Sequence, residues 1–304
     1  MYQAQRSATS KFIPIRHLHY HVLSWGTPSA TLPPLVMVHG WMDVGASFQF
    51  VVDAFSVAFA QGRQIIAPDW RGYGLTETPA LDNFWFPDYL ADLDFLLDAV
   101  SPHQSVDLLG HSMGGNVVML YAGSRPERVR RLINLEGFGM PASQPVQAPK
   151  RYAKWMDELK SLHRGELALA SYDSADGVAR RLMKTNPRLQ EDKAQWLALH
   201  WARPNAQGRW DILGHAAHKV VNANLYQVEE TLALYRSISA PLLAVEASHN
   251  QMAQWWQSRY SLAEYHERLR QVPQYTIAQI SDAGHMLHHD QPLQLARLIE
   301  DFLA

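Results

Sequence analysis

The alternation of short apolar runs with amphipathic segments is the feature that most constrains the fold of this chain. Residues 35–38, 64–67 and 105–109 are mostly apolar runs that end at glycine, proline or a polar residue. Such runs are typical of strands buried on both faces of a parallel sheet. Residues 86–100 follow the second run and place apolar side chains at helical spacing. Strands that alternate with helices predict an α/β fold, in which a mostly parallel, twisted sheet carries helices on both faces.

The alternation is interrupted once, near residue 140, and resumes near residue 240. Helical spacing continues through this stretch without a clear buried strand, and four tryptophans lie in it: Trp155, Trp196, Trp201 and Trp210. Further strands are predicted at residues 241–245 and 275–280, and a terminal helix at 293–303. We therefore predict an α/β core at residues 1–139 and 240–304, interrupted by a helical cap at residues 140–239.

The composition narrows the class of protein and of partner. The 304 residues are 47% hydrophobic and 18% charged, which is typical of a globular chain with a large core. The formal net charge is −2 and no basic block stands out, so neither nucleic acid nor a membrane surface is predicted as a partner. The chain has no cysteine, which excludes disulfides and thiolate metal sites. Residues 1–10 carry no apolar signal core, and no run reaches the roughly 18 apolar residues of a membrane span, so a cytoplasmic location is expected.

Residues 110–114 read Gly-His-Ser-Met-Gly, which has the form G-x-S-x-G. The pattern alone is weak evidence for a catalytic serine, but here it follows an apolar run and precedes a helix-like segment. A sharp turn between strand and helix lifts a serine hydroxyl above the sheet, and glycines admit the close backbone approach there. The helix that follows directs N–H groups and the positive end of its dipole at the site. This context predicts Ser112 as a nucleophile.

A serine hydroxyl needs a base to remove its proton, and histidine suits that task near neutral pH. Among the 15 histidines, His285 is distinguished by its position between the last predicted strand and the last predicted helix. Loops at the carboxyl ends of strands reach the edge where open α/β sheets bind ligands. We therefore predict His285 as the general base, and we interpret the neighbouring His288 and His289 as bystanders.

Acyl transfer also needs two N–H donors directed at the developing oxyanion. The amide of Met113, directly after the nucleophile, is one candidate. The other is expected from the loop after the strand at residues 35–38, and we choose the Trp41 amide. Asp43 lies close to this loop and its role stays open, whereas Asp69, at the start of another loop, is interpreted as structural.

Four motifs occur in the order seen in α/β-hydrolases, and the chain resembles that superfamily over nearly its whole length outside the cap. They are residues 39–41 (His-Gly-Trp), 69–74 (Asp-Trp-Arg-Gly-Tyr-Gly), 110–115 and 284–285 (Gly-His). Residues 39–43 and 135–139 are also similar to the serine-hydrolase-like branch. The resemblance implies an α/β-hydrolase fold and a catalytic triad that requires no cofactor and no metal.

The acid of the triad departs from the commonest pattern of the family, which places an aspartate shortly after the strand that follows the cap. Here that strand is followed by residues 246–251 (Glu-Ala-Ser-His-Asn-Gln), and the usual position holds His249 or Asn250. Some relatives, including certain haloalkane dehalogenases, carry the acid at the end of the strand after the nucleophile's helix, where this chain has Glu136. The resemblance therefore favours Glu136 as the residue that orients the histidine. The alternatives are that Glu246 is the acid or that the site has no acid.

These residues predict a serine hydrolase, most simply a carboxylesterase, that cleaves a small or medium ester through an acyl-enzyme. The same parts serve C–C, amide or thioester hydrolysis and acyl transfer, so these reactions stay open. Dehalogenase and epoxide hydrolase activities are disfavoured, because those relatives use an aspartate at the position of Ser112. A non-catalytic ligand-binding homologue is the alternative that the missing aspartate encourages. The sequence does not indicate an oligomeric state.

Other histidines are interpreted as surface residues. His17, His19 and His21 alternate along a predicted strand and share one face. We interpret that face as exposed, and not as a metal site, because no carboxylate lies among them. His215 and His218 are three residues apart in the cap and predict a solvated helix face.

Overall fold

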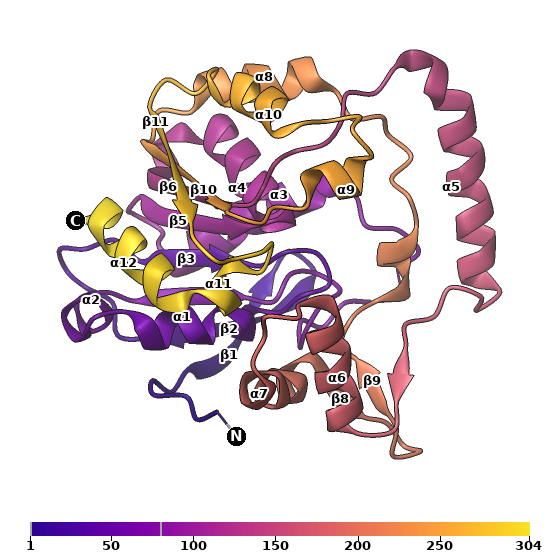
Figure 1. The fold of residues 1–304 in the computed structure, drawn as a ribbon, viewed down its shortest axis with the longest axis horizontal. Coiled ribbons are helices and arrows are strands. Elements are labelled where there is room, and N and C mark those ends of the chain that lie inside the picture. Colours follow the sequence, from indigo (N-terminus) through magenta and orange to yellow (C-terminus); the bar gives the residue numbers. More distant parts are fainter. Residues whose placement is uncertain (1, 80) are drawn as a thin grey trace.

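The computed structural model describes residues 2–79 and 81–304. Its centre is an eight-stranded sheet in the order β1-β2-β4-β3-β5-β6-β10-β11 (Figure 1). The strands are β1 (Thr9–Ile15), β2 (Leu18–Trp25), β3 (Leu35–Val38), β4 (Ile65–Pro68), β5 (Val106–His111), β6 (Val129–Leu135), β10 (Leu242–Ala247) and β11 (Tyr275–Ile280). The pairs β1–β2 and β2–β4 are antiparallel, and the other neighbouring pairs are parallel. The prediction of a mostly parallel sheet is confirmed.

The register of the parallel strands brings their carboxyl ends to one edge of the sheet. Val38 in β3 pairs with Gly110 in β5. Leu135 in β6 pairs with His111 on one side and with Val245 in β10 on the other. The loops that follow these four strands therefore begin side by side, at the edge where open α/β sheets form their ligand sites.

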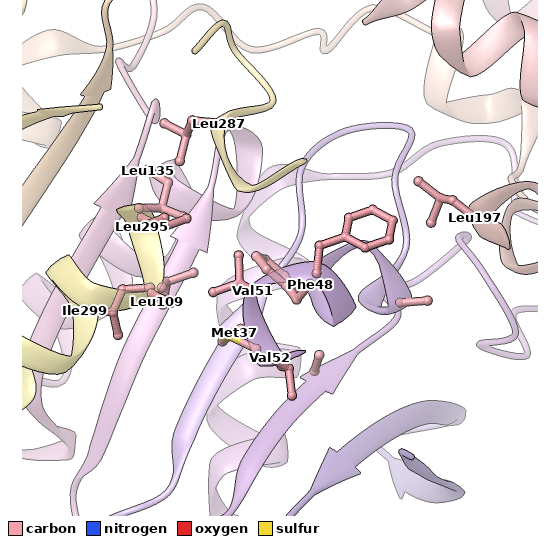
Figure 2. Close-up of a cluster of buried hydrophobic side chains, with 14 of the residues drawn as sticks. Met37, Phe48, Val51, Val52, Leu109, Leu135, Leu197, Leu287, Leu295 and Ile299 are labelled. Carbon is pink, nitrogen blue, oxygen red and sulfur yellow. The ribbon is translucent and has the colours of Figure 1, made fainter. Parts of the chain in front are cut away.

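Helices cover both faces of the sheet. They are α1 (Gln49–Ala54), α2 (Val57–Gly62), α3 (Phe86–Val100), α4 (Met113–Ser124), α9 (Met252–Trp256), α10 (Leu262–Leu269), α11 (Leu287–Asp290) and α12 (Pro292–Leu303), with short 3-10 turns η1 (Gly45–Phe48) and η2 (Pro126–Arg128). Figure 2 shows one face, where Met37, Leu109 and Leu135 from the strands share an apolar cluster with α1 and α12. Their sequence neighbours Val36 and Leu108 belong to the cluster on the other face, together with residues of α3 and α4. The predicted two-faced helical covering is confirmed.

Between β6 and β10 the chain leaves the sheet. This segment contains η3 (Pro145–Gln147), α5 (Ala148–His163), β7 (Ser171–Tyr172), α6 (Ala175–Thr185), α7 (Glu191–Trp201), β8 (Ala202–Pro204), β9 (Trp210–Ile212), η4 (Ala216–Lys219) and α8 (Val228–Ser237). It is largely helical, but β7, β9 and β8 form a small antiparallel sheet that the sequence does not predict. Because these strands have two or three residues and are mostly exposed or half-buried, they lack the apolar run that marks a buried strand. The predicted domain boundaries at residues 139/140 and 239/240 stay a prediction.

None of the helices in the described part of the chain has the length and apolar character needed to cross a membrane. The cytoplasmic location stays a prediction.

Candidate active site

Ser112 stands on a sharp turn between β5 and α4. Its backbone has φ 54° and ψ −114°, a strained conformation for a residue with a side chain, and its N–H donates to the Leu135 carbonyl at 2.8 Å. The turn is so tight that a Cβ on Gly110 would lie 2.2 Å from the Gly114 oxygen. A Cβ on Gly114 would lie 2.4 Å from the Val38 oxygen. Both glycines of the motif are therefore required sterically, and the serine side chain is presented at the strand-end edge.

His285 reaches Ser112 from the loop between β11 and α11. Its Nε2 lies 2.9 Å from Ser112 Oγ, within hydrogen-bond distance for proton transfer. The His285 carbonyl accepts a hydrogen bond from His111 Nε2 at 2.8 Å, which ties this loop to the residue before the serine. The Trp255 ring meets the imidazole edge-on, with 4.4 Å between ring centroids. The structure thus brings together the two residues that the sequence predicts as nucleophile and base.

Glu136 contacts the other side of the same imidazole. Its Oε2 lies 3.3 Å from His285 Nδ1, and its Oε1 accepts the Ala247 N–H at 2.6 Å. The turn that presents it is unusual, because Glu136 has φ 56°. The side chain of Asn134 bridges this turn by accepting the Gly137 N–H and donating to the Gly137 carbonyl, each at 2.9 Å. Burial raises the pKa of Glu136, and the hydrogen bonds from His285 and the Ala247 amide act against that shift.

Glu246, the alternative acid, contacts a histidine other than His285. Its Oε1 lies 2.6 Å from Nε2 of His266 on α10. Successive strand residues point to opposite faces, and Glu246 follows Val245, which belongs to the cluster on the α12 face. Of the two carboxylates considered from sequence, the structure brings Glu136 to His285 and places Glu246 elsewhere.

The two predicted oxyanion donors border the same cavity as the serine. Met113 is the first residue of α4, and Trp41, with a side chain 55% exposed, lies in the turn after β3. Gly40 brings that turn against the nucleophile, since a Cβ there would lie 3.1 Å from the Ser112 Cβ. His39 fixes the turn by accepting the Trp70 N–H at 2.9 Å. The roles of the Trp41 and Met113 amides stay a prediction.

A cavity of about 880 Å³ opens at the serine. Its apolar walls come from the core and from the segment between β6 and β10, including Phe86, Phe138, Met140, Leu169, Leu182, Leu189, Trp201 and Ile212. The basic side chains of Arg181 and Lys219 also border it. Of the four tryptophans between β6 and β10, Trp201 lines this cavity. Sequence reasoning missed Trp255 and Trp256, which line it from α9 and carry no motif that would mark them.

Two interpretations of surface histidines are wrong. His21 is buried, and its Nδ1 lies 2.7 Å from Asp69 Oδ2, because a loop distant in sequence covers that part of β2. His218 is stacked between the rings of Tyr73 and Phe84, with centroid separations of 3.9 and 3.8 Å. Burial lowers the pKa of His218 to about 3, so the imidazole is neutral and anchors η4 to the core.

The contacts of Asp69 agree with its interpretation as a structural residue. Its carboxylate accepts the N–H groups of Gly45 at 2.7 Å and Leu75 at 2.9 Å, in addition to its contact with His21. It therefore joins the loops after β3 and β4.

Comparisons with known proteins place this chain in a family. A family model described as "alpha/beta hydrolase fold" matches residues 33–292. The chain is 26% identical over 278 residues to a 2-hydroxymuconate semialdehyde hydrolase of Pseudomonas putida, a match that covers 89% of this chain and 87% of that protein. It is 26% identical over 273 residues to an sn-1-specific diacylglycerol lipase of Danio rerio, covering 89% and 78%. A serine hydrolase-like protein of Dictyostelium discoideum is 26% identical over 175 residues, covering 57% and 46%. In three of the curated matches, including this last one, the chain spans slightly less than half of the relative's length.

Solved structures share the architecture along nearly the whole chain. A thioesterase domain from a curacin biosynthetic pathway superposes with a TM-score of 0.81 at 24% identity, covering 97% of this chain and 99% of that one. A hypothetical protein from Pseudomonas aeruginosa PAO1 has a TM-score of 0.82 at 22% identity, covering 96% and 97%. At these identities the likeness concerns the fold alone, and it confirms the predicted fold class.

Proposed function

The chain belongs to the α/β-hydrolase family, and from that membership and the geometry of the site we propose that it is a serine hydrolase acting on carboxylic esters. The observation that carries the proposal is the continuous contact from Glu136 through His285 to Ser112, with separations of 3.3 and 2.9 Å. This order of acid, imidazole and hydroxyl is the arrangement that activates a serine oxygen.

The proposed reaction has two halves. In the first, His285 Nε2 takes the proton from Ser112 Oγ while the oxygen attacks the ester carbonyl carbon. The amides of Trp41 and Met113 stabilise the oxyanion, and His285 then protonates the departing alkoxide, which leaves as an alcohol. In the second half His285 takes a proton from water, the hydroxide attacks the acyl carbon, and Ser112 leaves with the proton returned by His285. The products are a carboxylic acid and the free enzyme.

Glu136 acts through the imidazole. Its carboxylate holds the proton of His285 on Nδ1, so that Nε2 presents a lone pair to the serine, and it stabilises the imidazolium that forms. The Ala247 amide fixes the second carboxylate oxygen. With Glu136 as the acid, the chain needs no aspartate at the usual position after β10.

The cavity supports a small or medium ester with an apolar acyl or alcohol group. About 880 Å³ lies within the range of pockets that bury a small organic ligand, and the walls next to the serine are mainly apolar and aromatic. The ester is our first choice, because a neutral carbonyl with an alkoxide leaving group suits this machinery without further catalytic groups. Thioesters, amides and C–C bonds next to a carbonyl are the alternative substrates of the same triad.

A fluorophosphonate probe tests the proposal, because it reacts with activated serines. The wild-type chain should be labelled within minutes and Ser112→Ala should not be labelled. Ser124→Ala, at the far end of the same helix, is the matched control and should label as wild type does. Absence of labelling in correctly folded wild type would reject the serine hydrolase and favour a non-catalytic ligand-binding homologue.

A further inference from the structure

Three buried side chains of metal-binding type meet next to the candidate active site. Asp43 comes from the loop after β3, and His288 and His289 come from α11. Their exposed fractions are 3%, 0% and 4%, and Asp43 and His289 border the cavity that opens at Ser112. One ligand atom from each lies within 4.8 Å of the other two.

The carboxylate of Asp43 is oriented for a further partner. Its Oδ1 accepts hydrogen bonds from the Val44 N–H at 2.9 Å and from Trp201 Nε1 at 3.1 Å. Its Oδ2 has no hydrogen-bond partner among the described residues and lies 3.8 Å from His288 Nε2. One oxygen of this carboxylate is thus held by hydrogen bonds, and the other lies near an imidazole nitrogen. Carboxylates that bind metal ions commonly have such supporting hydrogen bonds.

The two imidazoles converge on the same point. Ser47, in η1, has its Oγ 3.2 Å from His288 Nε2 and 2.5 Å from His289 Nε2. The Nε2 atoms of both histidines therefore face a shared centre that also includes a hydroxyl. Because a buried carboxylate is costly without a compensating positive charge, this centre is suited to a cation.

We propose that Asp43, His288 and His289 bind a transition-metal ion of the zinc class, with Ser47 or a water as the fourth ligand. Two imidazoles and one carboxylate form a typical ligand set for zinc, whereas magnesium and calcium prefer oxygen ligands alone. Tetrahedral bonds of about 2.0–2.1 Å place neighbouring ligand atoms roughly 3.3 Å apart. The 3.8 Å between Asp43 Oδ2 and His288 Nε2 is about 0.5 Å longer than that value.

A metal here would join two loops of the active site. Asp43 lies two residues after Trp41, and His288 lies three residues after His285. The ring of His288 also packs on His111, with 4.3 Å between centroids, and His111 donates to the His285 carbonyl. Binding would therefore stabilise the chain and hold together the two loops that carry Trp41 and His285, whatever its substrate. The proposal rests on the cluster alone and does not depend on ester hydrolysis.

The test is metal binding by the full chain, measured after treatment with a chelator. Zinc is titrated in competition with a chromophoric chelator, and the melting temperature is followed in parallel. We expect one ion per wild-type chain and a rise in melting temperature. Asp43→Asn and His288→Ala should weaken binding by more than about tenfold.

Two further variants separate this site from others. His19→Ala removes an exposed imidazole that pairs with Glu77 at 2.9 Å, and it controls for adventitious binding at the surface. His285→Ala removes the imidazole next to Ser112. Both variants should bind the ion as wild type does.

X-ray absorption of the zinc-loaded wild type keeps the test decisive if a buried variant fails to fold. It should show two histidine nitrogens and at least one oxygen at about 2.0 Å. The proposal would be overturned if the wild type bound no stoichiometric zinc. It would also be overturned if both Asp43→Asn and His288→Ala kept zinc binding, or if His19→Ala or His285→Ala lost it. A first shell with fewer than two imidazoles would overturn the proposal as well.

Discussion

Replacing Glu136 by glutamine tests how the base is oriented, because the structure determines which end of the new amide meets which partner. One oxygen of Glu136 accepts the Ala247 N–H at 2.6 Å, and the other lies 3.3 Å from His285 Nδ1. In Glu136→Gln the amide oxygen stays on the Ala247 N–H, because an NH₂ group cannot accept that bond. The NH₂ group then faces His285 Nδ1 and favours the tautomer with its proton on Nε2. That nitrogen is the one that must accept the proton of Ser112.

The expected loss of rate follows from this tautomer. Replacing a triad acid by its amide costs about 10⁴-fold in kcat where the acid–histidine hydrogen bond is short. Because 3.3 Å is long for such a bond, we expect a loss of about 10³- to 10⁴-fold. At 1.36 kcal/mol for each factor of ten, this equals roughly 4 to 5.5 kcal/mol of lost transition-state stabilisation.

The assay is the initial rate of hydrolysis of p-nitrophenyl esters of graded acyl length. Glu246→Gln is the matched control, because its carboxylate contacts His266 and not the candidate base. We expect kcat of that variant to stay within about twofold of wild type. Wild-type kcat in Glu136→Gln, or a larger loss in Glu246→Gln than in Glu136→Gln, would refute the assignment of the acid.

Two further predictions concern stability. Gly114→Ala should lower the free energy of unfolding by at least about 2 kcal/mol in urea titrations, because its Cβ would lie 2.4 Å from the Val38 oxygen. In Gly62→Ala the new Cβ would have its nearest neighbour at 3.6 Å, so the free energy of unfolding should change by less than about 0.5 kcal/mol. Equal losses in the two variants would contradict the steric argument. Burial alone would raise the pKa of Asp69, but the hydrogen bond and charge of His21 lower this pKa overall. The Asp69 carboxylate therefore contributes stability that is present above pH about 4 and is lost as the pH falls further. Asp69→Asn should therefore cost roughly 3 kcal/mol at pH 6, and its stability should fall less than that of wild type between pH 5 and 3; parallel pH profiles would exclude this role.

Much of the core could be predicted because strands buried on both faces leave continuous apolar runs in the sequence. The run at 35–38 coincides with β3, and those at 64–67 and 105–109 differ from β4 and β5 by one or two residues at their ends. The strands β7, β8 and β9 were not predictable in the same way. They are short and little buried, so neither period-two alternation nor an apolar run marks them.

The candidate site was predictable where it depends on topology. Ser112 and His285 follow parallel strands, and parallel strands end at one edge, so their proximity follows from the order of elements. The choice between Glu136 and Glu246 depends instead on side-chain direction. Glu136 lies in a turn with φ 56°, whereas Glu246 lies within β10 and points toward α10. A pattern of residue types does not contain these directions.

Contacts between distant segments account for the remaining differences. The strand that carries His21 shows no carboxylate and predicts an exposed face, yet Asp69 covers this histidine from a loop 48 residues away. The burial of His288 and His289 against Asp43 likewise depends on how α11 packs on the loop after β3, and their interpretation as bystanders stays a prediction. Neither contact leaves a local signal in the sequence.

The proposed mechanism requires Ser112 to become covalently acylated during turnover. Rapid mixing with an excess of a slowly hydrolysed p-nitrophenyl ester, followed by acid quench and peptide mass spectrometry, measures this directly. We expect a burst of one equivalent of p-nitrophenol per chain and an acyl group on the peptide that contains Ser112, with both absent in Ser112→Ala. Steady ester turnover without a burst and without an adduct under these conditions, or an adduct on another residue, would contradict the proposed mechanism.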